Sequence, residues 1–466
     1  MKNKSIIRVV TFLVLISFCF NFSYLISFNS EISVTQNKIE SENYLEGEET
    51  FSLKTSGYWN LTGSPIYING LSSTGDWAYT VSNNDWCSGS GTWSDPYIIE
   101  NVIIDAQNSD NCLSIDATHD YFIIRNCTFY NSNTGSSPYY NAGIKLFNAK
   151  NGIIINNNIF SNYGSGITLR TLSNNNSITG NLITGNSRHG IYLRDRCESN
   201  TISGNTIENC RTGININDDC KFNLIKENKV RDNRDEGIGI FAYCEFNTLT
   251  MNKVSNSTDY GIAIQGFSDN NKVYENFVVR EGSPSVISLG SIALRNNTWN
   301  NSRIGNYYDI YLGDDSDKDG IGDSAYFIDS GVYDFLPIVD NDAPNITIGS
   351  PLSNEMFDGT IPTFNVTIQD RYLDETWYTL NEGTVKYYFT ENGSIDQAAW
   401  ESLPDGTVKI RFYGIDLPEN EAYKEVIVRK GFAITGISSY NFGIIISSIF
   451  IASVVSIIFL RKKPKK

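Results

Sequence analysis

A short acidic segment has the spacing of a calcium-binding loop. Carboxylates at alternate positions converge on one hard cation, Gly320 permits the sharp turn, and a neighbouring backbone carbonyl completes the shell. The expected calcium ligands are Asp315, Asp317, Asp319, Ile321 and Asp323. The pattern departs from a full twelve-residue calcium loop at Tyr326, where a glutamate would stand. The segment predicts a structural Ca²⁺ site, and the alternative is a solvated acidic turn.

A second acidic group is the candidate for carbohydrate chemistry. Asp195 and Asp218 lie 23 residues apart, one period of a repeat in the middle of the chain, and Asp219 is beside them. Hydrolysis of a glycosidic bond needs two carboxyl groups on one face. Arg194 and Arg196 flank the acids and are the candidate ligand-binding residues. The alternative is an exposed ladder of compensating charges.

Cysteines recur at the same spacing. Cys197, Cys220 and Cys244 hold one position of successive units, where Ser173 and Ser268 stand in the neighbouring ones. The interpretation is a ladder of small inward-facing side chains, with a disulfide or a thiolate copper site as alternatives. Copper is not expected, because the chain has only 2 His and 3 Met to serve as ligands.

Seven cysteines follow the N-terminal apolar run, so at least one thiol is free or intermolecular. Cys87 with Cys112 is the first pair to consider for a disulfide. His119 and His189 are the two histidines, and His189 is interpreted as a surface turn residue.

The elements that position these residues come from the repeat. Gly-Ile pairs recur every 23 or 24 residues, at Gly143, Gly166, Gly190, Gly213, Gly237 and Gly261. Aliphatic residues and asparagines recur at fixed offsets within each unit. The units contain short β-branched runs with alternating polarity and no helical periodicity, which predicts three short strands per unit. The expected fold is all-β: a right-handed parallel β-helix of about nine coils. Stacked asparagines would join the coils, and glycine would supply a positive φ at a corner.

The coil pattern resembles the NosD-type, carbohydrate-binding and sugar-hydrolase-like right-handed β-helix repeats of archaeal cell-surface proteins. The entry at 91–101, Gly-Thr-Trp-Ser-Asp-Pro-Tyr-Ile-Ile-Glu-Asn, resembles their N-terminal cap. The exit at 305–308, Gly-Asn-Tyr-Tyr, resembles their C-terminal cap. The resemblance covers roughly residues 75–340. It implies fold more firmly than function, since such proteins include binding, scaffolding and enzymatic members.

The remaining segments place the β-helix outside the cell. Three basic residues before an apolar run predict a signal peptide or signal anchor. An uncharged apolar stretch near the C-terminus is long enough to span a bilayer, and the basic tail after it should stay cytoplasmic. Alternating strands after residue 340 predict an immunoglobulin-like sandwich, with Trp377 and Trp400 in its core. The expected organisation is 1–28 signal, 29–74 N-terminal segment, 75–340 β-helix with caps, 341–430 immunoglobulin-like domain, 431–441 linker, 442–460 transmembrane helix and 461–466 cytoplasmic tail.

The net charge of the chain excludes one class of binding partner. The formal net charge is −16 although both ends are basic, so the body is more acidic still and nucleic-acid binding is excluded. Sequons of the N-x-[ST] type fit an exported glycoprotein. We expect a single-pass membrane protein with an extracellular body. Its β-helix is expected to be a non-catalytic rod that binds glycans or cell-envelope partners. The alternative is an extracellular glycoside hydrolase or polysaccharide lyase that uses the Asp195 and Asp218 face.

Overall fold

The computed structural model describes residues 59–133, 141–279, 287–289, 296–329 and 331–431. The signal at 1–28, the linker at 431–441 beyond its first residue, the membrane span at 442–460 and the tail at 461–466 lie outside these residues. Within the described part, no helix has the length and apolar character needed to cross a membrane.

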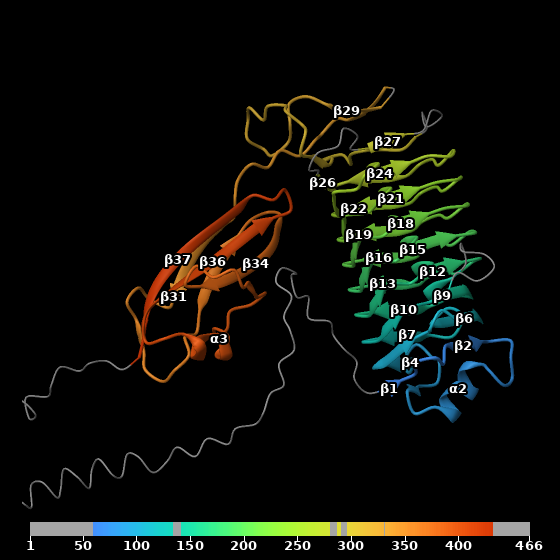
Figure 1. The fold of residues 1–466 in the computed structure, drawn as a ribbon. Helices are drawn as coiled ribbons and strands as arrows, with labels where there is room; N and C mark the ends of the chain where they lie inside the picture. The colour runs from blue at the N-terminus through green and yellow to red at the C-terminus, as the bar shows by residue number, and fades with distance from the viewer. Residues whose placement is uncertain (1–58, 134–140, 280–286, 290–295, 330, 432–466) are drawn as a thin grey trace, which may run out of the picture. The chain divides into compact units, whose positions relative to one another are not determined.

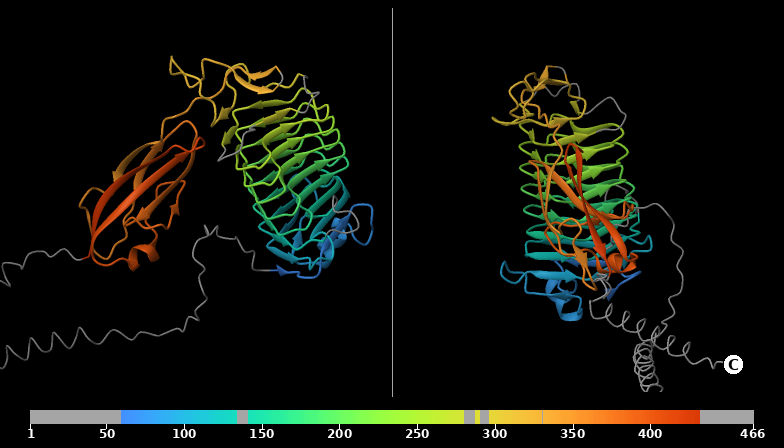
Figure 2. Two further views of the ribbon diagram at one scale, coloured as in Figure 1. Left: turned by 45° about the horizontal axis from the view of Figure 1, so that its top comes forward. Right: turned by 90° about the vertical axis from the view of Figure 1, so that its left-hand side faces the viewer.

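Three sheets form the faces of a β-helix, and each coil contributes one strand to each sheet (Figures 1 and 2). Neighbouring strands are parallel, except that the strand at Cys87–Ser88 is antiparallel to the next one. The first sheet contains, in spatial order, β1 (Trp59–Asn60), β5 (Val102–Asp105), β8 (Thr128–Tyr130), β11 (Asn158–Phe160), β14 (Leu182–Thr184), β17 (Thr206–Glu208), β20 (Lys229–Arg231), β23 (Lys253–Ser255), β26 (Phe277–Val279) and β28 (Tyr307–Tyr308). The second contains β25 (Lys272–Tyr274), β22 (Thr248–Thr250), β19 (Leu224–Lys226), β16 (Thr201–Ser203), β13 (Ser177–Thr179), β10 (Gly152–Ile155), β7 (Phe122–Arg125), β4 (Tyr97–Glu100) and β3 (Cys87–Ser88). The third contains β2 (Ile66–Asn69), β6 (Leu113–Thr118), β9 (Ala142–Ala149), β12 (Ser165–Arg170), β15 (His189–Arg194), β18 (Thr212–Ile216), β21 (Glu236–Ile240), β24 (Tyr260–Ile264) and β27 (Ile287–Leu289).

The predicted parallel β-helix is confirmed, with about seven regular turns. The expectation of about nine coils was therefore too high. The sheets also begin before residue 75, because β1 pairs with β5 and β2 pairs with β6. A short helix, α2 (Trp77–Asn83), follows β2, and its Trp77 ring stacks on Tyr97 at the N-terminal end.

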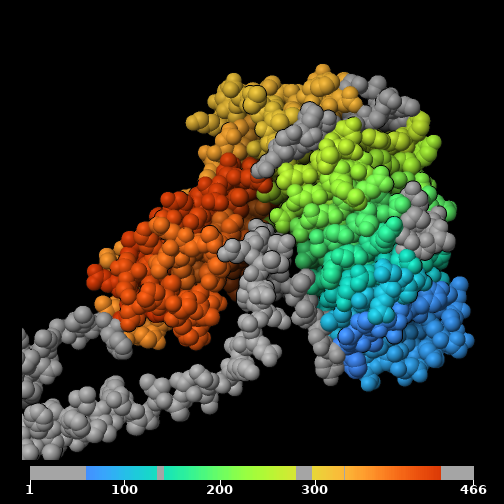
Figure 3. Space-filling view, viewed as in Figure 1, coloured from blue at the N-terminus to red at the C-terminus, as the bar shows by residue number. Residues whose placement is uncertain are grey.

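Aliphatic rows fill the interior, as the repeat predicted. Each coil points aliphatic side chains of the third sheet inward, and Ile191, Ile214 and Ile238 pair in register and are fully buried. Matching rows from the other two sheets, such as Ile202 with Ile207, close the core. Each coil packs mainly on its two neighbours, so the colours follow one another in order along the β-helix (Figure 3).

Stacked asparagines join the coils at two corners. The backbone N–H and the Nδ2 of Asn181 both donate to Oδ1 of Asn205, at 3.0 and 2.9 Å. Asn205 donates in the same way to Asn228, at 3.1 and 2.9 Å. This row, the asparagine ladder, contains Asn157, Asn181, Asn205, Asn228, Asn252, Asn276 and Asn306. It ends at the buried Asp334, whose Oδ2 accepts from the backbone N–H of Asn306 at 2.7 Å.

The repeated glycines serve a different purpose from the one expected. They do not have a positive φ, whereas Gly180 and Gly204 at another corner do. A Cβ on Gly213 would stand 2.3 Å from Cγ1 of Val230 and 2.6 Å from the carbonyl oxygen of Gly237. Glycine is therefore required here by the close approach of neighbouring coils.

The C-terminal region is a separate β domain with its own core. One sheet pairs β31 (Asn345–Ser350) with β33 (Asn365–Gln369). The other contains β32 (Met356–Phe357), β37 (Glu421–Lys430), β36 (Gly406–Asp416), β34 (Leu373–Leu380) and β35 (Tyr387–Tyr388). A short helix, α3 (Gln397–Ser402), adds Trp400 to the core, as predicted. Trp377 is buried outside this core, where its ring stacks on that of Tyr413. Before this domain, β29 (Tyr326–Asp329) pairs with β30 (Val332–Asp334).

Candidate functional site

The structure brings together the predicted acids Asp195 and Asp218. Both follow strands of the third sheet and have left-handed backbones, with φ of 62° and 54°. Nε of Arg194 lies 2.6 Å from Asp218 Oδ2 and 3.6 Å from Asp195 Oδ1. Arg170 of the preceding coil adds a contact of 2.8 Å to Asp195. The arginines alternate with the acids along the axis, which is the geometry of a charge ladder.

The other residues predicted beside this pair extend the same pattern. Asp219 contacts Lys221 at 3.0 Å, and Lys221 contacts Glu245 of the next coil at 2.8 Å. Arg196 is exposed at the corner. The face therefore carries compensating charges over several coils, and the carboxylates of Asp195 and Asp218 share one arginine between them.

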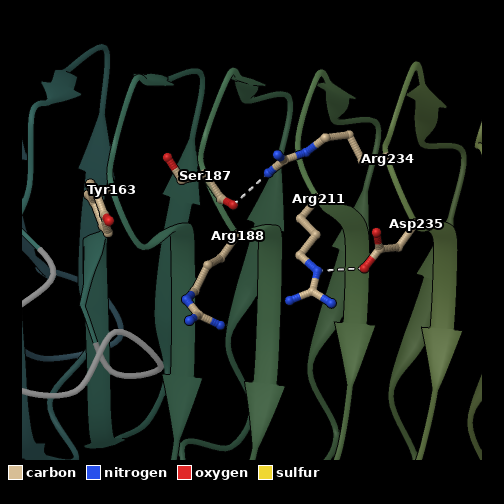
Figure 4. A pocket seen from close by; sticks show the side chains of 6 residues that line it. All are labelled: Tyr163, Ser187, Arg188, Arg211, Arg234 and Asp235. Atoms are coloured by element: carbon tan, nitrogen blue, oxygen red, sulfur yellow. Dashed lines mark hydrogen bonds and ion pairs between the residues drawn. The ribbon is translucent and has the colours of Figure 1, made fainter.

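A hollow on the β-helix surface lies at a different corner, where the first sheet passes into the third. We call it the arginine groove; it has a volume of about 600 Å³ and is lined by Tyr163, Ser187, Arg188, Arg211, Arg234 and Asp235 (Figure 4). Arg211 Nε lies 2.5 Å from Asp235 Oδ2, and Arg234 donates to the carbonyl oxygen of Ser187 at 2.9 Å. The guanidinium groups of Arg188 and Arg211 lie side by side (Figure 4).

Sequence reasoning missed this groove because its residues do not repeat. The position two residues before the glycine holds Gly164, Arg188, Arg211, Asp235 and Asp259 in successive units. The available signal was that two arginines occur one period apart in an acidic chain. Arg211 and Asp235 occupy the same position in adjacent units and pair with each other, whereas the third arginine, Arg234, stands one position earlier in its unit.

His189 lies next to the groove, at the start of β15. Its ring centroid is 4.7 Å from that of Tyr192, and its Nδ1 is buried without a hydrogen-bond partner among the described residues. Burial, followed by the positive charges of Arg188 and Arg211, lowers the pKa of His189 to about 3. The imidazole is therefore neutral at pH 7, and the positive potential of the arginines extends to it.

Three of the five predicted calcium ligands lie together. Asp315, Asp317 and Asp319 each offer a carboxylate oxygen, and these oxygens lie within 4.8 Å of one another. Gly320 has a φ of +87°, which only glycine adopts readily, and its N–H donates to Asp315 at 2.9 Å. Asp323 instead accepts from the backbone N–H of Ser316 at 3.0 Å. Ile321 follows this turn, and its backbone N–H donates to Oδ1 of Asp319 at 2.8 Å.

A second acidic group has no counterpart in the sequence patterns. Carboxylate oxygens of Asp340, Asp370 and Asp416 also lie within 4.8 Å of one another. Burial, together with the charges of Asp416 and Asp370, raises the pKa of Asp340 to about 6. These residues are widely separated in the chain, so only the fold of the C-terminal domain brings them together.

The cysteine ladder is buried as predicted. The backbone N–H of Cys197 donates to Sγ of Cys220 at 3.2 Å, and that of Cys220 to Sγ of Cys244 at 3.3 Å. The seven described cysteines are all free. The disulfide considered between Cys87 and Cys112 is therefore wrong: Cys87 belongs to the second sheet, and Cys112 precedes a strand of the third.

A family model described as "Periplasmic copper-binding protein (NosD)" matches residues 59–256 and 140–313. The chain belongs to the NosD family. No curated protein matches it.

Solved structures similar to this NosD-family chain include two epimerases and one tailspike domain. The periplasmic alginate epimerase AlgG is 19% identical over 42% of this chain and 48% of its own, with a TM-score of 0.36. The A-module of the mannuronan C-5 epimerase AlgE4 from Azotobacter vinelandii is 16% identical over 43% and 64%, with a TM-score of 0.29. The enzymatically active domain of tailspike protein 2 from bacteriophage CBA120 is 10% identical over 70% and 67%, with a TM-score of 0.33. The match spans about half the length of AlgG.

The copper in the family's description does not fit the donor groups of this chain. Among the described residues, the groups of three or more possible metal ligands consist of aspartates alone, whereas copper favours imidazole and sulfur donors. Cysteines of the ladder stand one per coil, so three sulfurs do not converge on one ion.

Proposed function

We propose that this NosD-family protein is a non-catalytic surface protein whose β-helix binds glycans or cell-envelope components. The observation that carries the proposal is the arginine groove, an open hollow lined by hydroxyl, guanidinium and carboxylate groups. Such groups form the directional hydrogen bonds that the hydroxyls of a sugar chain require. The compensated charges around Asp195 and Asp218 support a binding role over hydrolysis at that face.

The test is a glycan array combined with a polysaccharide-cleavage screen on the full-length protein. We expect binding to a subset of glycans and no cleavage products. Turnover that disappears on Asp195→Asn or Asp218→Asn, but persists in the exposed control Asp232→Asn, would replace the binding role with a hydrolase or lyase. Failure to bind any glycan or envelope polysaccharide would remove the proposal.

In this role the β-helix would lie outside the cell. An N-terminal signal would export the chain, the segment 442–460 would hold it in the membrane, and the basic tail would remain cytoplasmic. The C-terminal two-sheet domain would act as an immunoglobulin-like spacer between the β-helix and the membrane. Its separate core supports an independent module of this kind.

We also propose that Asp315, Asp317 and Asp319 hold a structural Ca²⁺, with Ile321 and Asp323 completing the shell. Chelation by EGTA should then lower the thermal unfolding temperature by several degrees, because a cation at about 100 times its Kd contributes about 2.7 kcal/mol. Unfolding is followed by circular dichroism with and without added Ca²⁺.

Two variants separate the loop from nonspecific effects of the chelator. Asp317→Asn should abolish the response to EGTA, whereas the exposed control Asp342→Asn should retain it. An unfolding temperature that EGTA leaves unchanged in the unaltered protein would contradict the calcium assignment.

A further inference from the structure

We propose that the arginine groove binds an anionic polysaccharide, whose acidic groups pair with Arg188 and Arg211 while the sugar chain runs along the axis of the β-helix. This inference rests on the proposed glycan binding and adds the chemical class and direction of the ligand. The residues it uses lie outside the face of Asp195 and Asp218 that the sequence analysis considered.

The charge of the groove is opposite to that of the protein. Three arginines and one aspartate line it, whereas the chain as a whole has a formal net charge of −16. In the same turn position, the neighbouring units hold Gly164 on one side and Asp259 on the other. The positive charge is therefore confined to a few coils, which favours a local anionic ligand over general attraction to any polyanion.

The spacing of the arginines suits a linear chain of charges. Arg188 and Arg211 occupy equivalent positions of adjacent coils, so their backbones are about 4.8 Å apart along the axis. Their guanidinium groups lie side by side in the groove (Figure 4). A polysaccharide with an acidic group on successive sugars presents a similar row of anions. Such a chain would place one anion opposite each arginine.

The chemistry of the side chains fits carboxylate or sulfate. A guanidinium has five N–H donors in a planar fork, so Arg211 can hold Asp235 through Nε and also bind a second anion. The bond from Arg234 to the carbonyl oxygen of Ser187 ties one wall of the groove across two coils. Tyr163 and Ser187 add hydroxyl groups at the same hollow, where sugar hydroxyls can form hydrogen bonds.

His189 provides a local reporter of binding. Arg188 and Arg211 are the charged groups that lower its pKa after burial itself, and the ring of Tyr192 packs beside it. An anion that neutralises either arginine would change the electrostatic environment of the imidazole. The chain has only 2 histidines, so His119 serves as an internal reference in a nuclear magnetic resonance spectrum.

The experiment compares a polyuronate oligosaccharide, a sulfated glucan and a neutral glucan of equal length on the full-length protein by calorimetry. We expect one or both acidic probes to bind, with an affinity that falls as salt rises. Arg188→Gln/Arg211→Gln should weaken binding by at least tenfold. The control Arg125→Gln/Arg303→Gln makes the same change in charge outside the groove and should leave the affinity within twofold. Asp235→Asn should strengthen binding severalfold.

The outcomes distinguish this inference from the proposed function. Preference between the two acidic probes identifies carboxylate or sulfate as the acidic group, and a shift of the His189 signal without one of His119 places the ligand at the groove. Equal binding of the neutral glucan, unaffected by the arginine changes, would overturn the anionic inference and leave glycan binding intact. Binding of single-stranded DNA as tight as that of the acidic sugars would overturn it as well. If no glycan of any kind bound, both proposals would fail.

Discussion

Replacing Asn205 by alanine should lower the free energy of unfolding by about 4 kcal/mol, since each buried polar group left without a partner costs about 1–3 kcal/mol. The side chain of Asn205 accepts from the backbone N–H of Asn181 at 3.0 Å and donates to the carbonyl oxygen of Ile178 at 2.9 Å. Both groups belong to the preceding coil and lie inside the protein. Alanine offers neither an acceptor nor a donor to them.

Urea denaturation followed by circular dichroism measures the effect of Asn205→Ala. The matched control is Asn341→Ala at an exposed position, where a change within about 0.5 kcal/mol is expected. A loss below about 1 kcal/mol for Asn205→Ala would show that water or a rearranged coil replaces the amide. The stacked asparagines would then contribute little to the joining of the coils.

Gly213→Ala should cost about 3 kcal/mol, near the upper end of the usual range for overpacking a dense interior. The new Cβ would stand 2.3 Å from Cγ1 of Val230 and 2.6 Å from the carbonyl oxygen of Gly237. Backbone on one side and a stiff β-branched side chain on the other leave little room for relaxation. Two adjacent coils would have to separate locally to admit the methyl group.

Gly204→Ala is the control for the glycine prediction. This residue has a φ of +61° and nothing within 4 Å of the place that the added methyl group would take, so only the backbone penalty of about 1 kcal/mol is expected. Urea denaturation shows which of the two variants loses more unfolding free energy. If Gly204→Ala proved the more damaging, backbone conformation rather than coil spacing would explain the repeated glycines.

The repeat made most of the β-helix predictable. Isoleucine and asparagine recur at fixed offsets because every coil places them in the same environment, as Ile191 and Asn205 show. The same logic failed at the ends, where β1 and β2 join the sheets through segments without the repeated pattern. The purpose of Gly213 also depended on a distance between coils, which spacing in the sequence does not reveal.

The candidate sites also differ in how well the sequence predicts them. Local spacing was enough to find Asp315, Asp317 and Asp319, since a single turn brings them together. The arginine groove depends on which side chains of adjacent coils point to the same hollow, and its members do not repeat. Arg188 and Arg211 could be recognised as a pair only once the fold had placed them beside each other in space.

The asparagine ladder also gives the β-helix an electrical polarity. Each Oδ1 in the row accepts from the N-terminal side, and each backbone N–H donates toward the C-terminal end, as the contacts from Asn181 to Asn205 and from Asn205 to Asn228 show. Each Nδ2 donates once in that direction and once back to a carbonyl oxygen of the preceding coil, as in Asn205. The amide dipoles therefore add, with their positive end at Asn306. The carboxylate of Asp334 meets that end, as an N-cap aspartate meets the first turn of an α-helix. The carboxylate of Asp334 thus occupies the position that the asparagine of a further coil would need, and that asparagine would have to displace it.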